Sequence, residues 1–467
     1  MTTSPSTPAP DLAAPSTAEQ APLARGQRFT YLGYAVDPAE GVVTCRYALD
    51  DHEFSERVAV PGAPAGAWST PAADAAARLV FLLAGVSYYK AGAPPVIDLG
   101  GHAVTPTERA FLLEYHLDGL GEFAHRNGLD LSGLVIEGPS REAAPVAVPG
   151  VDAASRAPLV PFGGGVDSIV SVELLRELGV EPALFVVNRP GDRFEAIEEP
   201  AAVAGLPVIR AERTIDPLIL RSRELGFLNG HVPVTGIISA IAVLAAVVHG
   251  RDAVVMSNEW SASSATLVVD GRSINHQYSK SEEFESGLRV VLAETFAPVV
   301  DYFSLLRPFT ELWIAKRFAR LEQYFSTFRS CNRAFHIDPA KRAATWCGRC
   351  DKCAFIDLIL SPYVPAEALR AVFGGAEPLE DDSLLDTFRT LLAVVPDAKP
   401  WECVGDESEC RIAARMAAAR PDREGNRLLK VLLAQAAPFT DPDPEHLLTP
   451  VGRHHVPARY APRDLLG

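Results

Sequence analysis

Three consecutive glycines followed by an acidic and a hydroxyl side chain are the sharpest chemical signal in this chain. Gly163, Gly164 and Gly165 separate the apolar run APLVPF from the helix-like segment SIVSVELLRELG, which Asp167 and Ser168 open. Glycines let a backbone turn tightly and approach a ligand, and the N–H groups at a helix start favour phosphate. We therefore predict that the glycines and Ser168 cradle phosphates while Asp167 holds Mg²⁺. The alternative is a plain glycine turn.

Two asparagines close later strand-like runs and extend this prediction. Asn188 ends the run ALFVVN, and Asn258 follows the run DAVVMS. In open α/β sheets, ligands bind outside the carboxyl ends of the strands. We therefore predict that both asparagines line the nucleotide pocket. For Asn188, a turn residue ahead of Pro190 is an equal alternative.

Four cysteines fall within one short stretch, with the pattern Cys331-x15-Cys347-x2-Cys350-x2-Cys353. Tetrahedral Zn²⁺ takes four nitrogen or sulfur ligands, and two-residue spacers let neighbouring sulfurs converge on one ion. Iron–sulfur clusters use the same ligands, and an unligated set is the third alternative. Because no residue pattern here demands redox chemistry, we predict a structural Zn²⁺ site.

The segment NHQYSKS places an imidazole, a phenol and an amine close together ahead of a helix. Side chains of an extended segment alternate with period two, which would put His276, Tyr278 and Lys280 on one side. Such a trio can supply a general base, a proton donor and an anion clamp. We predict these three for proton transfer or carboxylate binding, with Glu259 as an additional base; a solvated loop is the alternative. Arg307 could bind an anion or lie on a solvated face.

The elements that must position these residues alternate between strand and helix from Ala157 onward, which predicts an α/β fold with a parallel sheet and helices on both faces. Upstream, strand-like runs precede two amphipathic helices. We divide the chain into a disordered tail (1–27), an N-terminal α+β domain (28–150), a catalytic domain with the phosphate loop and the cysteines (151–365) and a helical C-terminal region (366–467).

Charge and hydropathy exclude several classes of protein. The 467 residues include 43 Lys+Arg against 59 Asp+Glu, a net charge of −16, whereas a protein that coats nucleic acid needs a basic surface. The longest apolar stretch, 237–248, is shorter than the roughly 20 residues of a membrane span. The N-terminus lacks the pattern of a signal peptide, and cysteine is sparse. We expect a cytoplasmic protein with a small-molecule substrate and neither nucleic acid nor membrane as partner.

Eight stretches together resemble the UDP-N-acetylmuramoyl-L-alanyl-L-glutamate epimerase (MurL) family. They are LLAGVSYYKA, GLGEFAHRNGLDL, FGGGVDS, MSNEWSAS, NHQYSKSEEFE, LRPFTELWIAK, WCGRCDKCAFIDLILSP and KPWECVG, spread over residues 75 to 405. The loop FGGGVDS also resembles the SGGxDS loop of PP-loop ATP pyrophosphatases, with Gly163 in place of the leading serine. The cysteines are similar to those of 7-cyano-7-deazaguanine synthase, a PP-loop enzyme, although the spacing after the first cysteine is shorter there.

This resemblance implies a PP-loop sheet and an ATP-dependent epimerase. The enzyme would convert the terminal L-Glu of UDP-MurNAc-L-Ala-L-Glu to D-Glu through an acyl-adenylate, releasing AMP and pyrophosphate. It implies ATP and Mg²⁺ at the glycine loop and a structural Zn²⁺ at the cysteines. The alternatives are an amide or nitrile synthase of the deazaguanine type, a non-catalytic zinc-stabilised nucleotide-binding protein, and a relative that epimerises another glutamyl peptide.

Overall fold

A mixed sheet of ten strands runs through the molecule. The computed structural model describes residues 25–152, 154–269, 271–336, 338–395, 402 and 404–465, so nearly all of the tail predicted at 1–27 lies outside the described residues. The strands are β1 (Arg28–Asp37), β2 (Val42–Leu49), β3 (His52–Ala59), β4 (Val96–Asp98), β5 (Val135–Glu137), β6 (Leu159–Pro161), β7 (Ala183–Asn188), β8 (Val208–Thr214), β9 (Ala253–Met256) and β12 (Asp301–Ser304). Strands β10 (Leu267–Val269) and β11 (Arg272–Ile274) form a separate hairpin.

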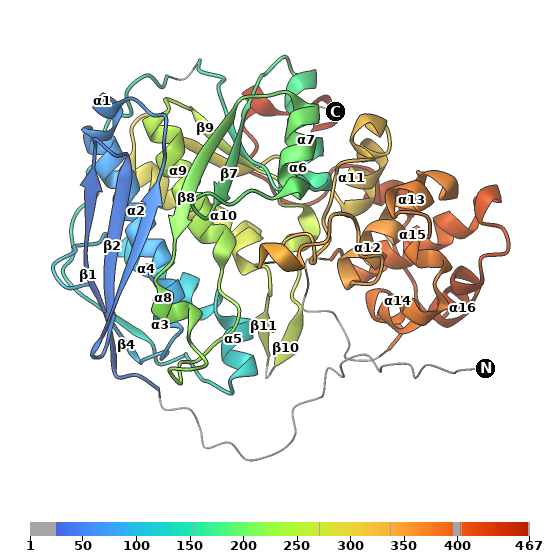
Figure 1. The fold of residues 1–467 in the computed structure, drawn as a ribbon, viewed down its shortest axis with the longest axis horizontal. Coiled ribbons are helices and arrows are strands. Elements are labelled where there is room, and N and C mark those ends of the chain that lie inside the picture. The colour runs from blue at the N-terminus through green and yellow to red at the C-terminus, as the bar shows by residue number, and fades with distance from the viewer. Residues whose placement is uncertain are drawn as a thin grey trace, which may run out of the picture.

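Helices pack on the sheet and continue past it as a C-terminal group (Figure 1). Those up to the cysteines are α1 (Ala65–Trp68), α2 (Pro71–Ala84), α3 (Val86–Tyr89), α4 (Pro106–Leu117), α5 (Gly121–Arg126), α6 (Val166–Glu177), α7 (Glu195–Ala204), α8 (Pro217–Leu220), α9 (Val234–Val248), α10 (Glu282–Thr295) and α11 (Glu311–Phe318). The C-terminal group is α12 (Asp351–Leu360), α13 (Ala366–Val372), α14 (Leu385–Leu391), α15 (Glu407–Ala418), α16 (Arg427–Ala436) and α17 (Pro444–Leu447).

The glycine loop follows the strand at which the strand order reverses. The full order is β12-β9-β6-β7-β8-β3-β2-β1-β4-β5, and the five strands from β12 to β8 are parallel. From β6 the chain continues to β7 and β8 on one side and then crosses to β9 and β12 on the other. The carboxyl ends of the strands at such a switch point form the usual ligand crevice of open α/β sheets.

Both faces of this parallel part are buried. Val160 and Leu184 belong to one apolar core, together with residues of α6, α7 and α11. Their strand neighbours Leu159 and Phe185 belong to the other, together with residues of α2 and α9. Successive strand side chains point to opposite faces, so this division places helices on both sides of the sheet. The predicted α/β class and two-sided helical cover are confirmed.

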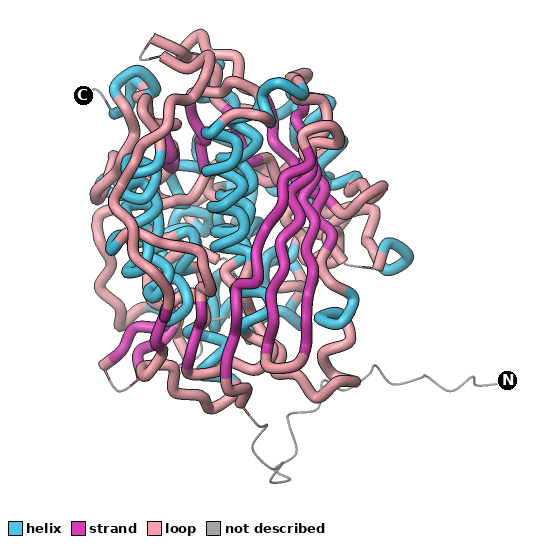
Figure 2. The backbone as a smooth tube through the Cα atoms, turned by 90° about the vertical axis from the view of Figure 1, so that its left-hand side faces the viewer, coloured by secondary structure: helices cyan, strands magenta, loops and turns pink. Residues whose placement is uncertain are grey.

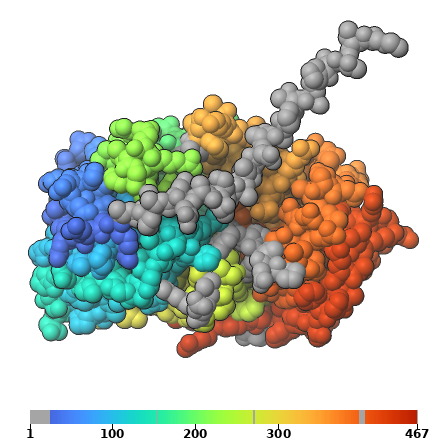
Figure 3. All heavy atoms as spheres, turned by 90° about the horizontal axis from the view of Figure 1, so that it is seen from below, coloured from blue at the N-terminus to red at the C-terminus, as the bar shows by residue number. Residues whose placement is uncertain are grey.

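The N-terminal strands extend the same sheet. Strand β3 pairs antiparallel with β8, with Val58 opposite Arg213. At this junction the buried Arg213 guanidinium donates to both carboxylate oxygens of Glu56, at 2.8 and 3.0 Å. The long strands β1 to β3 stand side by side at this end of the molecule (Figure 2), and the C-terminal helices lie at the other end (Figure 3). The domain limits given above stay a prediction.

Local signals in the sequence fix several helix ends. Thr105 and Glu108 form a capping box at the start of α4, and Ser281 caps α10 by accepting the Phe284 N–H at 3.3 Å. Gly205, at φ 63°, ends α7 in the left-handed conformation. The apolar stretch at 237–248 lies within the buried α9, as predicted. A second helical stretch, Pro71–Tyr89, is by length and composition able to cross a membrane, and 83% of it is buried inside the molecule.

Candidate functional site

A cavity of about 450 Å³ opens at the carboxyl ends of β6, β7 and β9. The predicted nucleotide residues that line it are Gly163, Gly165, Asp167, Ser168 and Asn258. Lys280 lines it as well, so the glycine loop and one end of NHQYSKS meet in one cavity.

The three glycines of the loop differ in what they do. At Gly164 the φ is +74°, and a Cβ there would lie 2.1 Å from the Ala196 carbonyl oxygen. At Gly165 a Cβ would lie 2.7 Å from the Ser330 Oγ, whereas at Gly163 it would meet nothing within 4 Å. Gly164 and Gly165 therefore permit close packing of the loop, and Gly163 leaves space on the cavity side. Gly165 is the N-cap residue of α6 and offers no side-chain cap, although the Ser168 hydroxyl donates to the Gly165 carbonyl at 3.1 Å.

Asn188 is buried at the end of β7, next to Val187, which lines the cavity. Neither its amide nitrogen nor its amide oxygen has a hydrogen-bond partner within the described part of the chain. Buried polar groups normally have partners, so this amide is of the kind that a bound ligand satisfies. Asn188 itself is not among the residues that line the cavity, and its predicted role stays a prediction.

The segment around the first cysteine forms the facing wall of the cavity. Arg329, Ser330 and Asn332 line it, and the Arg329 N–H donates to the Gly164 carbonyl at 3.3 Å. Lys352, which lies between the last two cysteines, also lines the cavity. Sequence reasoning missed Arg329 and Lys352, because nothing in their local sequence connects them to the glycine loop. With Lys280, they give the cavity three cationic side chains.

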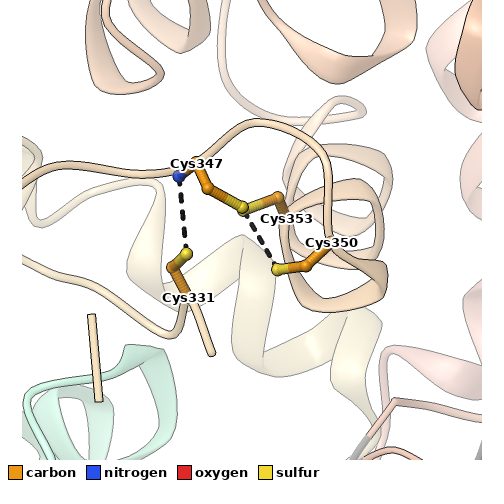
Figure 4. Close-up of side chains that lie close together, drawn as sticks. All are labelled: Cys331, Cys347, Cys350 and Cys353. Atoms are coloured by element: carbon orange, nitrogen blue, oxygen red, sulfur yellow. Dashed lines mark hydrogen bonds between the residues drawn. The ribbon is translucent and has the colours of Figure 1, made fainter. Parts of the chain in front are cut away.

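The four cysteines converge, as their spacing predicted (Figure 4). All four sulfur atoms lie within 4.8 Å of one another; the Cys347 and Cys353 sulfurs are 3.6 Å apart and the Cys350 and Cys353 sulfurs 3.4 Å apart. A tetrahedral ion with Zn–S bonds of about 2.3 Å separates its sulfurs by about 3.8 Å, so the geometry fits Zn²⁺. Hydrogen bonding within the cluster, chiefly between Cys331 and Cys350, lowers the pKa of the Cys331 thiol and raises that of the Cys350 thiol.

The segment NHQYSKS is not extended, which corrects the prediction that three of its side chains share one side. Tyr278–Lys280 forms a 3-10 turn (η2), so period-two alternation does not apply. The Lys280 ammonium donates to the Gln277 amide at 3.2 Å, beside the cavity. The Tyr278 hydroxyl donates to the Glu114 carboxylate at 3.1 Å, and burial and that carboxylate raise the pKa of Tyr278.

His276 is not among the residues that line the cavity and belongs to a separate cluster. Its Nδ1 is hydrogen-bonded to the Glu122 carboxylate, and its ring centroid lies 4.4 Å from that of His231. Burial, followed by the charges of His276 and Lys280, lowers the pKa of His231 to about 4. Sequence reasoning missed Glu122 and His231, because they are remote from His276 in the chain.

Arg307 is buried and is not among the residues that line the cavity. It is 1% exposed, and its Nε pairs with the Glu285 carboxylate at 3.2 Å. Its guanidinium also donates to the backbone carbonyls of Glu259, at 2.8 Å, and Lys280. The solvated face is therefore wrong, and the anion-binding role that the sequence also allowed stays a prediction. Arg307 fixes the backbone of two residues that were predicted to act on the substrate.

Glu259 belongs to a group of buried carboxylates near the glycine loop. Its side chain is 6% exposed, that of Glu311 is 7% exposed and that of Glu409 is fully buried. Burial first, and then the charges of Glu259 and Asp167, raise the pKa of Glu311 well above its ordinary value. Burial likewise raises the pKa of Glu409 to about 8. Because the charge of Asp167 acts on Glu311, at least one of these protonatable carboxyls lies near the glycine loop.

The fold and the cavity define an α/β protein with a glycine-loop ligand site at a topological switch point, walled on one side by a four-cysteine segment. Two family profiles match the chain: the MurL N-terminal domain over residues 21–305 and the MurL C-terminal domain over residues 327–446. The chain belongs to the MurL family, as the sequence resemblance indicated.

Curated relatives agree with this membership. A protein of Xanthomonas oryzae pv. oryzae is 38% identical over 92% of this chain and 95% of its own length, and one of Salinispora tropica is 38% identical over 95% and 96%. A Micromonospora protein is 37% identical over 94% of this chain and 98% of its own. All three are named UDP-N-acetyl-alpha-D-muramoyl-L-alanyl-L-glutamate epimerase. No solved structure matches the chain.

Proposed function

We propose that this protein epimerises the terminal L-Glu of UDP-MurNAc-L-Ala-L-Glu to D-Glu and consumes ATP to AMP and pyrophosphate. The observation that carries the proposal is similarity along more than nine-tenths of the chain to three proteins named for this epimerisation. The ATP requirement and the acyl-adenylate are our extension, and the glycine-loop cavity supports them.

The cavity suits a triphosphate. Gly163 leaves room for phosphate oxygens, and the uncapped start of α6 presents backbone N–H groups and a positive dipole end. Lys280 and Lys352 add positive charge from the facing walls. Asp167 lines the cavity in the first turn of α6 and would hold Mg²⁺, which neutralises charge on the phosphate oxygens. The four cysteines would hold Zn²⁺ and thereby fix the wall that carries Lys352.

Activation of the carboxylate explains why an epimerase would consume ATP. A carboxylate anion opposes a second negative charge at the neighbouring Cα, so the α-proton is barely acidic. Attack of a carboxylate oxygen on the α-phosphorus of ATP forms the acyl-adenylate, and pyrophosphate leaves. A base then removes the α-proton, and a proton returns to the opposite face. Water adds to the acyl carbon and AMP leaves, so the sum is L-Glu, ATP and water to D-Glu, AMP and pyrophosphate.

Lys280 and Glu259 are the proposed groups for binding the carboxylate and transferring the α-proton. Lys280 lines the cavity, and Glu259 directly follows Asn258, which lines it too. Arg307 holds both backbones in place. His276 and Tyr278, which the sequence suggested for the same step, are bonded to Glu122 and Glu114, and we assign them to the support of the site.

One incubation tests the proposal. The purified protein is mixed with ATP, Mg²⁺ and UDP-MurNAc-L-Ala-L-Glu, after which the released glutamate is analysed on a chiral column and AMP is measured. We expect D-Glu and AMP together, and a need for ammonia with its incorporation into product would instead indicate the amide or nitrile synthase. Unchanged L-Glu without AMP would refute the proposal.

Matched variants separate the two half-reactions. Asp167→Asn should abolish AMP formation and epimerisation alike, because the phosphates lose their metal. Lys280→Gln and Glu259→Gln should each slow epimerisation by about 100-fold or more, the usual size of a general acid–base contribution. The variant that lacks the true base should still form the adenylate while deuterium uptake at Cα from D₂O is lost. If both variants keep full epimerisation, the residue assignment is wrong.

A further inference from the structure

Glu122, His231 and His276 bring three metal-ligating side chains together outside the glycine-loop cavity. One potential ligand atom from each lies within 4.8 Å of those of the other two. Glu122 Oε2 is 3.9 Å from His231 Nδ1 and is hydrogen-bonded to His276 Nδ1. Two imidazole nitrogens and one carboxylate oxygen around a common point are a known three-ligand set for catalytic Zn²⁺.

Helix α5 supplies the carboxylate in a fixed orientation. Arg126, one turn along the helix, pairs with the other oxygen of Glu122, Oε1, at 2.7 Å. Glu122 is 6% exposed, so its carboxylate has little access to bulk water. The second oxygen, Oε2, therefore faces the two histidines. Carboxylates that bind metals are commonly oriented in this way by a partner that does not itself touch the metal.

The loop that carries His231 is tied down on both sides. Before it, the Leu228 N–H donates to the Ala91 carbonyl at 2.9 Å, and Lys90 Nζ donates to the Asn229 side chain at 2.7 Å. After it, the Tyr115 hydroxyl donates to the Pro233 carbonyl at 3.0 Å. These contacts fix the backbone on both sides of His231 independently of its own side chain. Ligands that are held in place before the metal binds favour binding, because the ion then does not have to order the loop.

The cluster adjoins the cavity. Lys280 lines the cavity and follows His276 closely in the chain. Thr235, in the first turn of α9, also lines the cavity and follows His231 closely. Three protein ligands leave a coordination position of a tetrahedral ion open. That position would take water or an anionic oxygen of the substrate.

We propose that Glu122, His231 and His276 bind a divalent transition metal of the Zn²⁺ class, at a second metal site distinct from the four cysteines and next to the glycine-loop cavity. The proposal concerns metal binding by the chain itself and stands whether or not the protein is an epimerase. The competing interpretation is a hydrogen-bonded His276–Glu122 pair that binds no metal.

Metal content tests the proposal directly. The full-length protein is purified after growth with Zn²⁺, dialysed against metal-free buffer and analysed by inductively coupled plasma mass spectrometry. The double variant His231→Ala/His276→Ala should hold about one equivalent of Zn²⁺ per chain less than the wild type, because one complete site is lost. His125→Ala, on the same helix α5 but exposed, is the matched control and should keep the wild-type content.

Cobalt distinguishes the two sites and controls for misfolding. Co²⁺ bound to thiolates gives an intense charge-transfer band, whereas Co²⁺ at an imidazole–carboxylate site gives weak visible bands alone. In the double variant the weak bands should vanish while the thiolate band remains, which also shows that the variant folds. Glu122→Gln, which preserves side-chain size, should weaken Co²⁺ binding at this site by about 10-fold or more. Equal Zn²⁺ content and unchanged cobalt spectra in wild type and variants would overturn the proposal.

Discussion

The cysteine cluster and the Glu122–His231–His276 cluster show two ways in which one chain brings ligands together. The four cysteines lie within residues 331–353, and a single loop and the start of α12 carry them. Glu122, His231 and His276 come from three distant segments, and only the packed fold places them within 4.8 Å. A local cluster keeps its ligands close even in a partly folded chain, whereas an assembled cluster exists only when the whole sheet and its helices have formed.

The largest effect should follow from removing the local cluster. Cys350→Ser/Cys353→Ser should abolish metal binding there, and structural Zn²⁺ sites contribute about 10 kcal/mol in isolated peptides. We expect ATP affinity to fall by about 100-fold or more, because the wall with Arg329 and Lys352 loses its anchor. Hydrogen exchange should rise in residues 328–360 and stay unchanged in residues 91–127. A variant that keeps both its metal and its ATP affinity would contradict this dependence.

The next effect concerns the β3–β8 junction, which joins the N-terminal strands to the parallel part of the sheet. Glu56→Gln leaves the buried Arg213 without its carboxylate partner, and breaking a buried ion pair costs about 3–5 kcal/mol. Guanidinium unfolding should show this loss, and the weak cobalt bands should disappear before the thiolate band as denaturant is added.

An exposed ion pair between β2 and β3 is the matched control. Arg46 and Glu53 are 2.9 Å apart, with side chains 60% and 65% exposed. Glu53→Gln should change the free energy of unfolding by less than about 1 kcal/mol, because solvent screens exposed pairs. If Glu56→Gln and Glu53→Gln behave alike, the β3–β8 junction does not hold the two parts of the sheet together.

The same distinction explains how much of the site could be predicted from the sequence. Glycine spacing after an apolar run placed Gly163 and Asp167 at the cavity, and the C-x2-C spacing placed the cysteines together, because both patterns lie within one local turn. The partners of His276 depend on how three segments pack, and no spacing within NHQYSKS encodes Glu122 or His231. The alternation argument for Tyr278 failed because a 3-10 turn replaces the extended segment.

For the overall fold, too, the local elements could be predicted from the sequence and the pairing of distant strands could not. Alternating apolar runs and helices from Ala157 gave the parallel strands and their two-sided cover, since each element carries its own periodicity. The joining of β3 to β8 was not predictable, because pairing between strands far apart in sequence depends on which edge is left open. As a result, one sheet crosses the limit of residue 150 that composition suggested.

A smaller effect should separate two neighbouring glycines of the glycine loop. Gly164→Ala forces a positive φ on alanine and a contact with the Ala196 carbonyl, which together should cost about 1–3 kcal/mol in the free energy of unfolding. Gly163→Ala meets no atom within 4 Å, so its stability should change by less than about 0.5 kcal/mol. ATP titration should nonetheless show weaker binding to Gly163→Ala, because the methyl group fills phosphate space. Unchanged ATP affinity in Gly163→Ala would place the phosphates elsewhere.

The smallest effect is a pH dependence confined to the half of the molecule that holds the cysteines. Glu409 of α15 faces Glu311 of α11, Glu259 and Asp406, and accepts the Leu312 N–H at 3.0 Å. Burial, the largest influence, raises its pKa from 4.5 to about 8.

Between these two pH values the folded state holds a proton on Glu409 that the unfolded state has released, so the free energy of unfolding falls as pH rises. We expect a loss of about 2 kcal/mol from pH 6 to pH 8 in guanidinium unfolding. Glu409→Gln should reduce this slope but not abolish it, because Glu311, whose pKa is also raised, keeps its own contribution, whereas Glu407→Gln, in the same helix, should leave the slope unchanged. A wild-type slope that persists undiminished in Glu409→Gln would assign the proton to another group.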